Sequence, residues 1–160
     1  MSRHRFHGDP ERFAILADYI AERYWHTIHF IADVAGGQGM LSRILTKKYN
    51  YRSEVIDPRS NTLKGVANQA LPFDGAMAAY YDLIVGLHPD EATRAVAEAA
   101  LVRPTILVPC CNFWSEEKLG QEELLQAIED FYQAHGVQYE RVKLPFNSPK
   151  NIALVSEPAK

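Results

Sequence analysis

The strongest constraint on the fold is an apolar segment that runs directly into a glycine cluster. Residues 28–34 read Ile-His-Phe-Ile-Ala-Asp-Val, residues 35–39 read Ala-Gly-Gly-Gln-Gly, and a helical apolar pattern begins at Met40. This order predicts a strand, a tight turn and a helix. Backbone N–H groups at such a helix start can hold an anionic group. The segment therefore indicates a nucleotide-like ligand.

Strand-like and helix-like segments alternate along the rest of the chain. We expect strands at 53–58, 81–87 and 105–108, and helices that begin near Asp9-Pro10-Glu11 and cover 40–49, 89–101 and 121–135. This alternation favours an α/β fold with a mostly parallel sheet and helices on both faces. Residues 59–80 allow either a helix or a poor strand before a turn at 72–75.

The end of the chain departs from the alternation. Residues 137–144 and 151–156 both read as strands, and only 145–150 separates them. A parallel crossover takes about a dozen or more residues, so these two strands should be antiparallel neighbours.

Length and composition indicate an ordinary globular chain. Its 160 residues suit a single domain, 1–160, with 1–27 as an N-terminal helical extension. The formal charge of −3 gives no general attraction to nucleic acid. No apolar run approaches the ~18–20 residues of a membrane span. Residues 1–7 are polar and basic, without the apolar core of a signal peptide. We therefore expect a cytoplasmic protein without a membrane partner.

The two cysteines, Cys110 and Cys111, are adjacent. Neighbouring cysteines rarely reach disulfide geometry, which argues against a disulfide framework. There is no C-x-x-C pair, so we expect no metal site.

An acid ends the second predicted strand. Asp57 stands 18 residues beyond Gly39, where an open α/β sheet reaches the ribose of a nucleotide bound at the first turn. Nicotinamide dinucleotides and S-adenosylmethionine both suit this arrangement. The dinucleotide pattern expects a further glycine or alanine where Ser42 stands, and the antiparallel end of the chain also fits it poorly.

Residues 33–39 resemble the first motif of class I S-adenosylmethionine-dependent methyltransferases, an acid followed by G-x-G-x-G, with Ala35 at the first glycine. The resemblance implies a Rossmann-like class I methyltransferase fold, which ends in an antiparallel strand pair, and S-adenosyl-L-methionine as cofactor. The residues it implies for cofactor binding are Asp33, Ala35, Gly36, Gly37 and Gly39 at the methionine part, Asp57 at the ribose, Asp74 at the adenine, and Leu87. Alanine is small, so the turn should persist if Ala35 has a negative φ.

Two further segments resemble one branch of these enzymes. Residues 86–88 read Gly-Leu-His and residues 109–111 read Pro-Cys-Cys, similar to the G-L-H and C-C motifs of the tRNA 2′-O-methyltransferase thirteen-like and related methyltransferase-like proteins. Residues 37–42 similarly resemble a G-K-G-x-L-S variant of the first motif. In that branch a Cys-Gly or similar pair follows G-L-H. Here Pro89-Asp90 follows, so the substrate is not carried over.

His88 is the candidate general base, because it follows a central strand at the edge where α/β folds bind ligands. Asp90 or Asn112 would assist it. Alternatively, His88 caps the following helix or holds its loop. A thiolate at Cys110 or Cys111 could attack a pyrimidine, but no basic residue lies close in sequence to activate it, so we favour small buried hydrophobes there.

The sequence leaves the methyl acceptor open between RNA and a small molecule. Six basic residues against two acids in 43–64 could meet a phosphate backbone or form a solvated face. The leading hypothesis is methyl transfer from S-adenosyl-L-methionine. The alternatives are a cofactor-binding interaction module without turnover and an NAD-dependent oxidoreductase.

Overall fold

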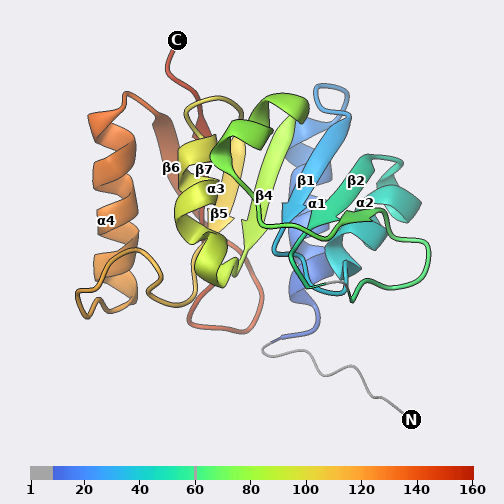
Figure 1. Ribbon diagram of the computed structural model, residues 1–160, viewed down its shortest axis with the longest axis horizontal. Helices are drawn as coiled ribbons and strands as arrows, with labels where there is room; N and C mark the ends of the chain where they lie inside the picture. The colour runs from blue at the N-terminus through green and yellow to red at the C-terminus, as the bar shows by residue number, and fades with distance from the viewer. Residues whose placement is uncertain (1–8, 60) are drawn as a thin grey trace.

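The computed structural model describes residues 9–59 and 61–160, so the polar start at 1–7 that argued against a signal peptide lies outside the described residues. A central sheet is flanked by helices (Figure 1). The strands are β1 Phe30–Val34, β2 Arg52–Ile56, β3 Asn68–Gln69, β4 Leu83–Leu87, β5 Thr105–Val108, β6 Gln138–Lys143 and β7 Ile152–Glu157. The helices are α1 Arg12–Tyr24, α2 Met40–Tyr49, α3 Thr93–Ala99 and α4 Gln121–Ala134, with 3₁₀ turns η1 Gly75–Tyr80 and η2 Asp90–Ala92.

The seven strands are ordered β3-β2-β1-β4-β5-β7-β6. The pairs from β3 to β5 are parallel, whereas β7 is antiparallel to both β5 and β6. The expected α/β class and the antiparallel strand pair at the C-terminus are therefore confirmed. The chain moves outward from β1 to β2 on one side and resumes at β4 on the other. This change of direction beside β1 is where open α/β sheets bind their ligands.

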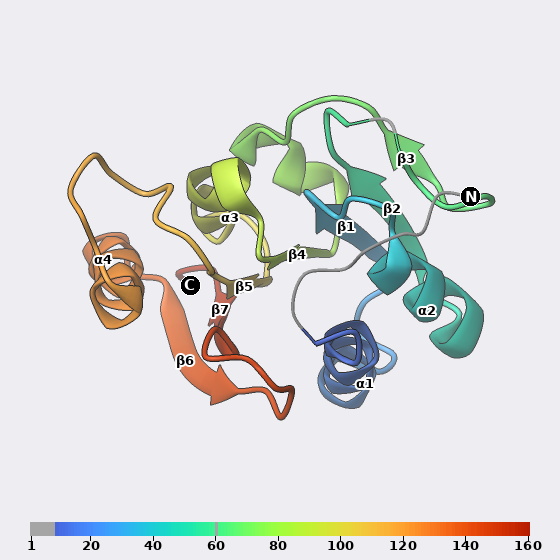
Figure 2. The same ribbon diagram turned by 90° about the horizontal axis from the view of Figure 1, so that it is seen from below.

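Helices cover both faces of the sheet (Figure 2). Successive residues of a strand point to opposite faces, so Ile31 packs with the core of α1 and α2, whereas Ala32 packs with the core of η1, α3 and α4. Leu83 and Ile84 divide between the two cores in the same way. This two-sided burial explains why the central strands read as continuous apolar runs.

The structure resolves the one region that the sequence leaves ambiguous, and it shortens one expected helix. Residues 59–80 contain the two-residue strand β3, which pairs parallel with β2, and then η1. The helix expected from 89 to 101 is shorter, because Asp90 has φ +50° and regular α-helix begins only at Thr93.

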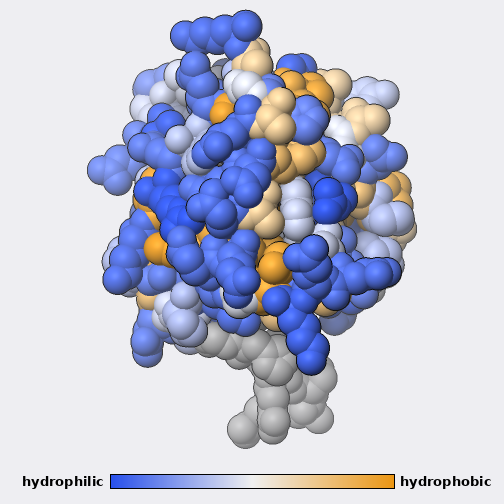
Figure 3. Space-filling model, turned by 90° about the vertical axis from the view of Figure 1, so that its left-hand side faces the viewer, coloured by the Kyte–Doolittle hydropathy of each residue, from blue (hydrophilic) through white to orange (hydrophobic). Residues whose placement is uncertain are grey.

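The side of the molecule that carries α4 is largely hydrophilic, with scattered apolar residues (Figure 3). Among the described residues, no helix is both long enough and apolar enough to cross a membrane.

Candidate functional site

The glycine turn joins β1 to α2 at the carboxyl edge of the sheet. Its backbone is left-handed at Gly37, with φ +59°, and at Gly39, with φ +85°. A Cβ built on Gly36 would lie 2.5 Å from Oδ1 of Asp33, so a larger residue would displace that carboxylate. The turn therefore packs its backbone directly against Asp33.

Asp33 is a buried acid fixed by α2. The N–H and the hydroxyl of Ser42 donate to Oδ2 of Asp33 at 3.2 and 2.8 Å, and Oγ of Ser42 lies 2.8 Å from Oγ of Ser53. Burial raises the pKa of Asp33 to about 6, against the lowering effect of the hydrogen bonds from Ser42. A cationic ligand group beside this poorly solvated carboxylate would stabilise its charged form.

Ala35 has φ +54°, so the expectation of a negative φ is wrong. Its N–H still donates to the Ile56 carbonyl at 2.8 Å, in continuation of the pairing between β1 and β2, while the chain already turns away toward α2. The left-handed conformation lets Ala35 keep this hydrogen bond while the chain turns toward α2. It is a conformation that favours glycine.

Asp57 follows β2, and its side chain is only 1% exposed. Oδ2 accepts the Gly37 N–H at 3.0 Å, which ties the end of β2 to the glycine turn. Arg59 donates to both carboxylate oxygens, through Nε at 3.0 Å and a terminal nitrogen at 2.8 Å. Burial favours the neutral acid, but the hydrogen bonds from Arg59 and Gly37 prevail and hold the pKa of Asp57 below its usual value.

Two cavities open beside the turn. The first has a volume of about 520 Å³ and lies among the glycine turn, the start of α1, the end of β4 and the loop before β7. The second, of about 530 Å³, is lined by Asp57, Phe73 and Phe113 among others. Ala35 and Asp90 line both cavities. The glycine turn thus lies between two cavities that share Ala35 in their linings.

His88 and Leu87 line the first cavity. Nε2 of His88 lies 2.9 Å from the Lys150 carbonyl oxygen, so this nitrogen carries a proton and Nδ1 keeps the lone pair. Burial lowers the pKa of His88. The ring thus joins the end of β4 to the loop before β7, in agreement with the loop-holding alternative, and a general-base role stays a prediction.

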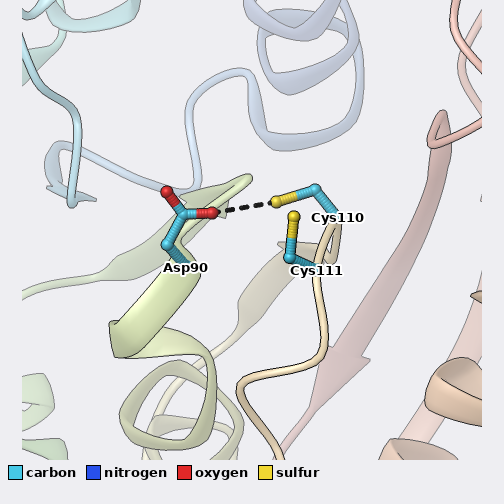
Figure 4. A group of neighbouring side chains, drawn as sticks. All are labelled: Asp90, Cys110 and Cys111. Atoms are coloured by element: carbon cyan, nitrogen blue, oxygen red, sulfur yellow. Dashed lines mark hydrogen bonds between the residues drawn. The ribbon is translucent and has the colours of Figure 1, made fainter. Parts of the chain in front are cut away.

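Asp90 contacts a cysteine (Figure 4). Sγ of Cys110 donates to Oδ1 of Asp90 at 3.1 Å, and Sγ of Cys111 lies close to both. Burial, reinforced by the hydrogen bond to Asp90, raises the pKa of Cys110. Nζ of Lys150 lies 3.9 Å from Sγ of Cys111, so a basic residue is present in space although 39 residues separate the two in sequence.

Two predicted site residues do not line either cavity. The Asn112 side chain accepts the Trp114 N–H and donates to the Glu117 carbonyl, within its own loop. Asp74 accepts the Ala76 N–H at 2.8 Å and caps η1. Their proposed catalytic and adenine-binding roles stay predictions.

Sequence reasoning missed several residues of the first cavity, namely Arg12, Phe13, Ser148 and Lys150. No motif marks them, because only the tertiary fold brings α1 and the loop before β7 to the glycine turn. Arg59 could have been predicted from the sequence, since it follows the ribose-binding candidate Asp57 by two residues.

No protein-family model and no curated protein sequence matches this chain. Solved structures do match it. A protein from Methanococcus maripaludis assigned as an S-adenosyl-L-methionine-dependent methyltransferase aligns with TM-score 0.63 and 14% identity over 100% of this chain and 97% of its own. The sugar N-methyltransferase KedS8 from a Streptoalloteichus species aligns with TM-score 0.61 and 13% identity over the same shares.

A ribosomal protein L11 methylase from Lactobacillus delbrueckii aligns with TM-score 0.59 and 15% identity over 91% of this chain and 77% of its own. The mostly parallel sheet of this chain ends in antiparallel strands, which the dinucleotide-binding order lacks. The chain therefore has the Rossmann-like fold of S-adenosylmethionine-dependent methyltransferases.

Proposed function

We propose that this protein binds S-adenosyl-L-methionine across the two cavities and transfers its methyl group to an acceptor in the first cavity. The observation that carries the proposal is the pair of cavities that share Ala35 in their linings. They lie beside β1, where the order of the strands along the chain reverses. A ligand with an amino-acid end and a nucleoside end needs two adjoining compartments of this kind.

The residues support a division of roles. The first cavity would take the methionine part, where Asp33 offers a buried negative charge and the glycine turn offers backbone N–H groups. Asp57 would accept the ribose hydroxyls at the boundary of the second cavity. The adenine ring would lie against Phe73 and Phe113, since aromatic faces stabilise planar bases. Asp74, beside Phe73 in the chain, stays a candidate for the edge of the base.

Methyl transfer is an in-line displacement, so the protein mainly has to position the two reactants. S-adenosyl-L-methionine supplies the methyl group and the leaving thioether. His88 would accept the proton of an acceptor hydroxyl or amine through Nδ1, the nitrogen that the Lys150 carbonyl leaves available. Asp90 and Asn112 remain proposed assistants to this step.

The acceptor is proposed as RNA or a small molecule. Arg12 and Lys150 line the first cavity and suit an anionic acceptor of either kind. Resemblance to the tRNA 2′-O-methyltransferase thirteen-like branch favours an RNA hydroxyl. Four basic side chains around a separate hollow of about 160 Å³ also suit a phosphate backbone, and they are Arg43, Lys47, Arg52 and Lys64.

The experiment follows the methyl group from labelled S-adenosyl-L-methionine into pools of RNA and of small molecules. We expect transfer by the wild type and a loss of at least about 100-fold in His88→Ala, within the range for general-base catalysis, with cofactor affinity retained. His135→Ala, at an exposed residue directly after α4, is the matched control.

Full activity in His88→Ala would rule out the base assignment. Cofactor binding without transfer to either pool would instead favour the interaction module.

A further inference from the structure

Three metal-binding side chains converge at one edge of the first cavity. Asp90 comes from the segment after β4, and Cys110 and Cys111 come from the segment after β5. One carboxylate oxygen and the two sulfur atoms all lie within 4.8 Å of one another (Figure 4). Because β4 and β5 are parallel neighbours, their carboxyl ends bring these two segments together.

From this geometry we infer that Asp90, Cys110 and Cys111 form a binding site for one thiophilic divalent cation such as Zn²⁺. Zinc is typically bound at about 2.0–2.3 Å by carboxylate oxygen and thiolate sulfur, so its tetrahedral ligands lie about 3–4 Å apart. The separations of the three ligand atoms allow that spacing with small rotations of the side chains. No C-x-x-C pair is needed, because the third ligand comes from a different strand end.

The charges at the site fit a divalent ion. Two thiolates and one carboxylate carry three negative charges. A divalent cation together with the ammonium of Lys150, 3.9 Å from Sγ of Cys111, balances them.

The three residues line the first cavity, so an ion held by them would have its remaining position open to that cavity. Three protein ligands with one open position are typical of catalytic rather than structural zinc sites. This role rests on the proposed function: the open position would bind the attacking heteroatom of the acceptor and lower its pKa.

The test uses the full chain, reduced with a phosphine and freed of metal with a chelator. Co²⁺ is titrated and read by thiolate-to-cobalt charge-transfer absorption, and Zn²⁺ is titrated by calorimetry. We expect one ion per chain. The Cys110→Ser/Cys111→Ser double variant should lose the absorption band, and Asp90→Asn should weaken binding by at least about tenfold while the band remains.

Asp130→Asn on the exposed face of α4 is the control for removal of a carboxylate and should bind like the wild type. Far-ultraviolet circular dichroism confirms that each variant folds. Absence of the charge-transfer band in the reduced wild type, or unchanged affinity in the double variant, would overturn the metal site.

Calorimetry with S-adenosyl-L-methionine on the same samples separates the two proposals. Cofactor binding without metal binding overturns the metal site alone, whereas metal binding without cofactor binding overturns the proposed function alone.

Discussion

At the scale of single residues, Ala35 has a strained backbone, and His88 and Asp90 also have positive φ. Ala35 holds φ +54° between the two cavities, in a conformation where a Cβ costs roughly 1–2 kcal/mol. Similar motifs have glycine at this place. The Cβ methyl group of Ala35 therefore adds strain between the two cavities that the proposed cofactor would span.

Replacing Ala35 by glycine should relieve that strain. We expect Ala35→Gly to raise the free energy of unfolding by about 0.5–1 kcal/mol, after the entropy cost of glycine is deducted. Chemical denaturation measures the change. Ala127→Gly within α4 is the control, where the same substitution should destabilise by about 1 kcal/mol. A loss of stability in Ala35→Gly comparable to that control would contradict the strained geometry.

Asp33 links stability to pH in a defined direction. Its folded pKa of about 6 exceeds the usual value of about 3.9 for an unfolded chain, so the folded state binds the proton more tightly. Its contribution to stability is therefore greatest below pH ~4 and declines as pH rises through 6. Relative to Asp33→Asn, the wild type should lose about 2–3 kcal/mol of unfolding free energy between pH 4 and 7.

Denaturant titrations at several pH values, without cofactor, measure this difference. Asp130→Asn, on the exposed face of α4, is the control for the loss of a carboxylate. A difference between the wild type and Asp33→Asn that does not change with pH would show that burial does not perturb the Asp33 carboxyl.

At the scale of elements, Arg59, which follows β2, occupies the carboxylate that is proposed to bind the ribose. Oδ1 of Asp57 accepts the backbone N–H and the Nε–H of Arg59, and Oδ2 accepts a terminal guanidinium N–H of Arg59 and the Gly37 N–H. A carboxylate has about four acceptor positions, so ribose hydroxyls would have to displace the Arg59 guanidinium. The Arg59 side chain is 67% exposed, which leaves it room to move.

Arg59→Gln should therefore bind S-adenosyl-L-methionine about two- to fivefold more tightly, because the ribose hydroxyls would no longer have to displace the guanidinium; a fivefold gain corresponds to about 1 kcal/mol. Calorimetry measures the change. Arg43→Gln, an exposed residue of α2 away from both cavities, is the matched control. Weaker binding in Arg59→Gln would mean that the guanidinium contacts the cofactor instead of competing with it.

At the scale of the whole molecule, the parts that could be predicted from the sequence are local in the chain. The strand, turn and helix around residues 28–49 follow from apolar patterning and glycine placement, and α2 has the expected bounds. The antiparallel partners β6 and β7 follow from the shortness of the linker at 145–150. In these segments, one short window contains all the determinants.

The remainder depends on contacts between distant segments. Lys150 reaches Cys111, and Asp90 reaches Cys110, only because the sheet places β4, β5 and the loop before β7 at one edge. The left-handed backbone at Ala35 and Asp90 was missed because neither residue type requires it. The strand β3 has only two residues, too few for an apolar pattern to develop.

The central claim is that the two cavities form one site for S-adenosyl-L-methionine, and calorimetry with that compound tests it most directly. We predict one site per chain in the wild type and at least about tenfold weaker binding in Gly37→Val and in Asp57→Ala. Gly136→Val, at another glycine of positive φ but beside α4, and Asp130→Ala should keep wild-type affinity. No binding by the wild type, or unchanged affinity in both site variants, would contradict the claim.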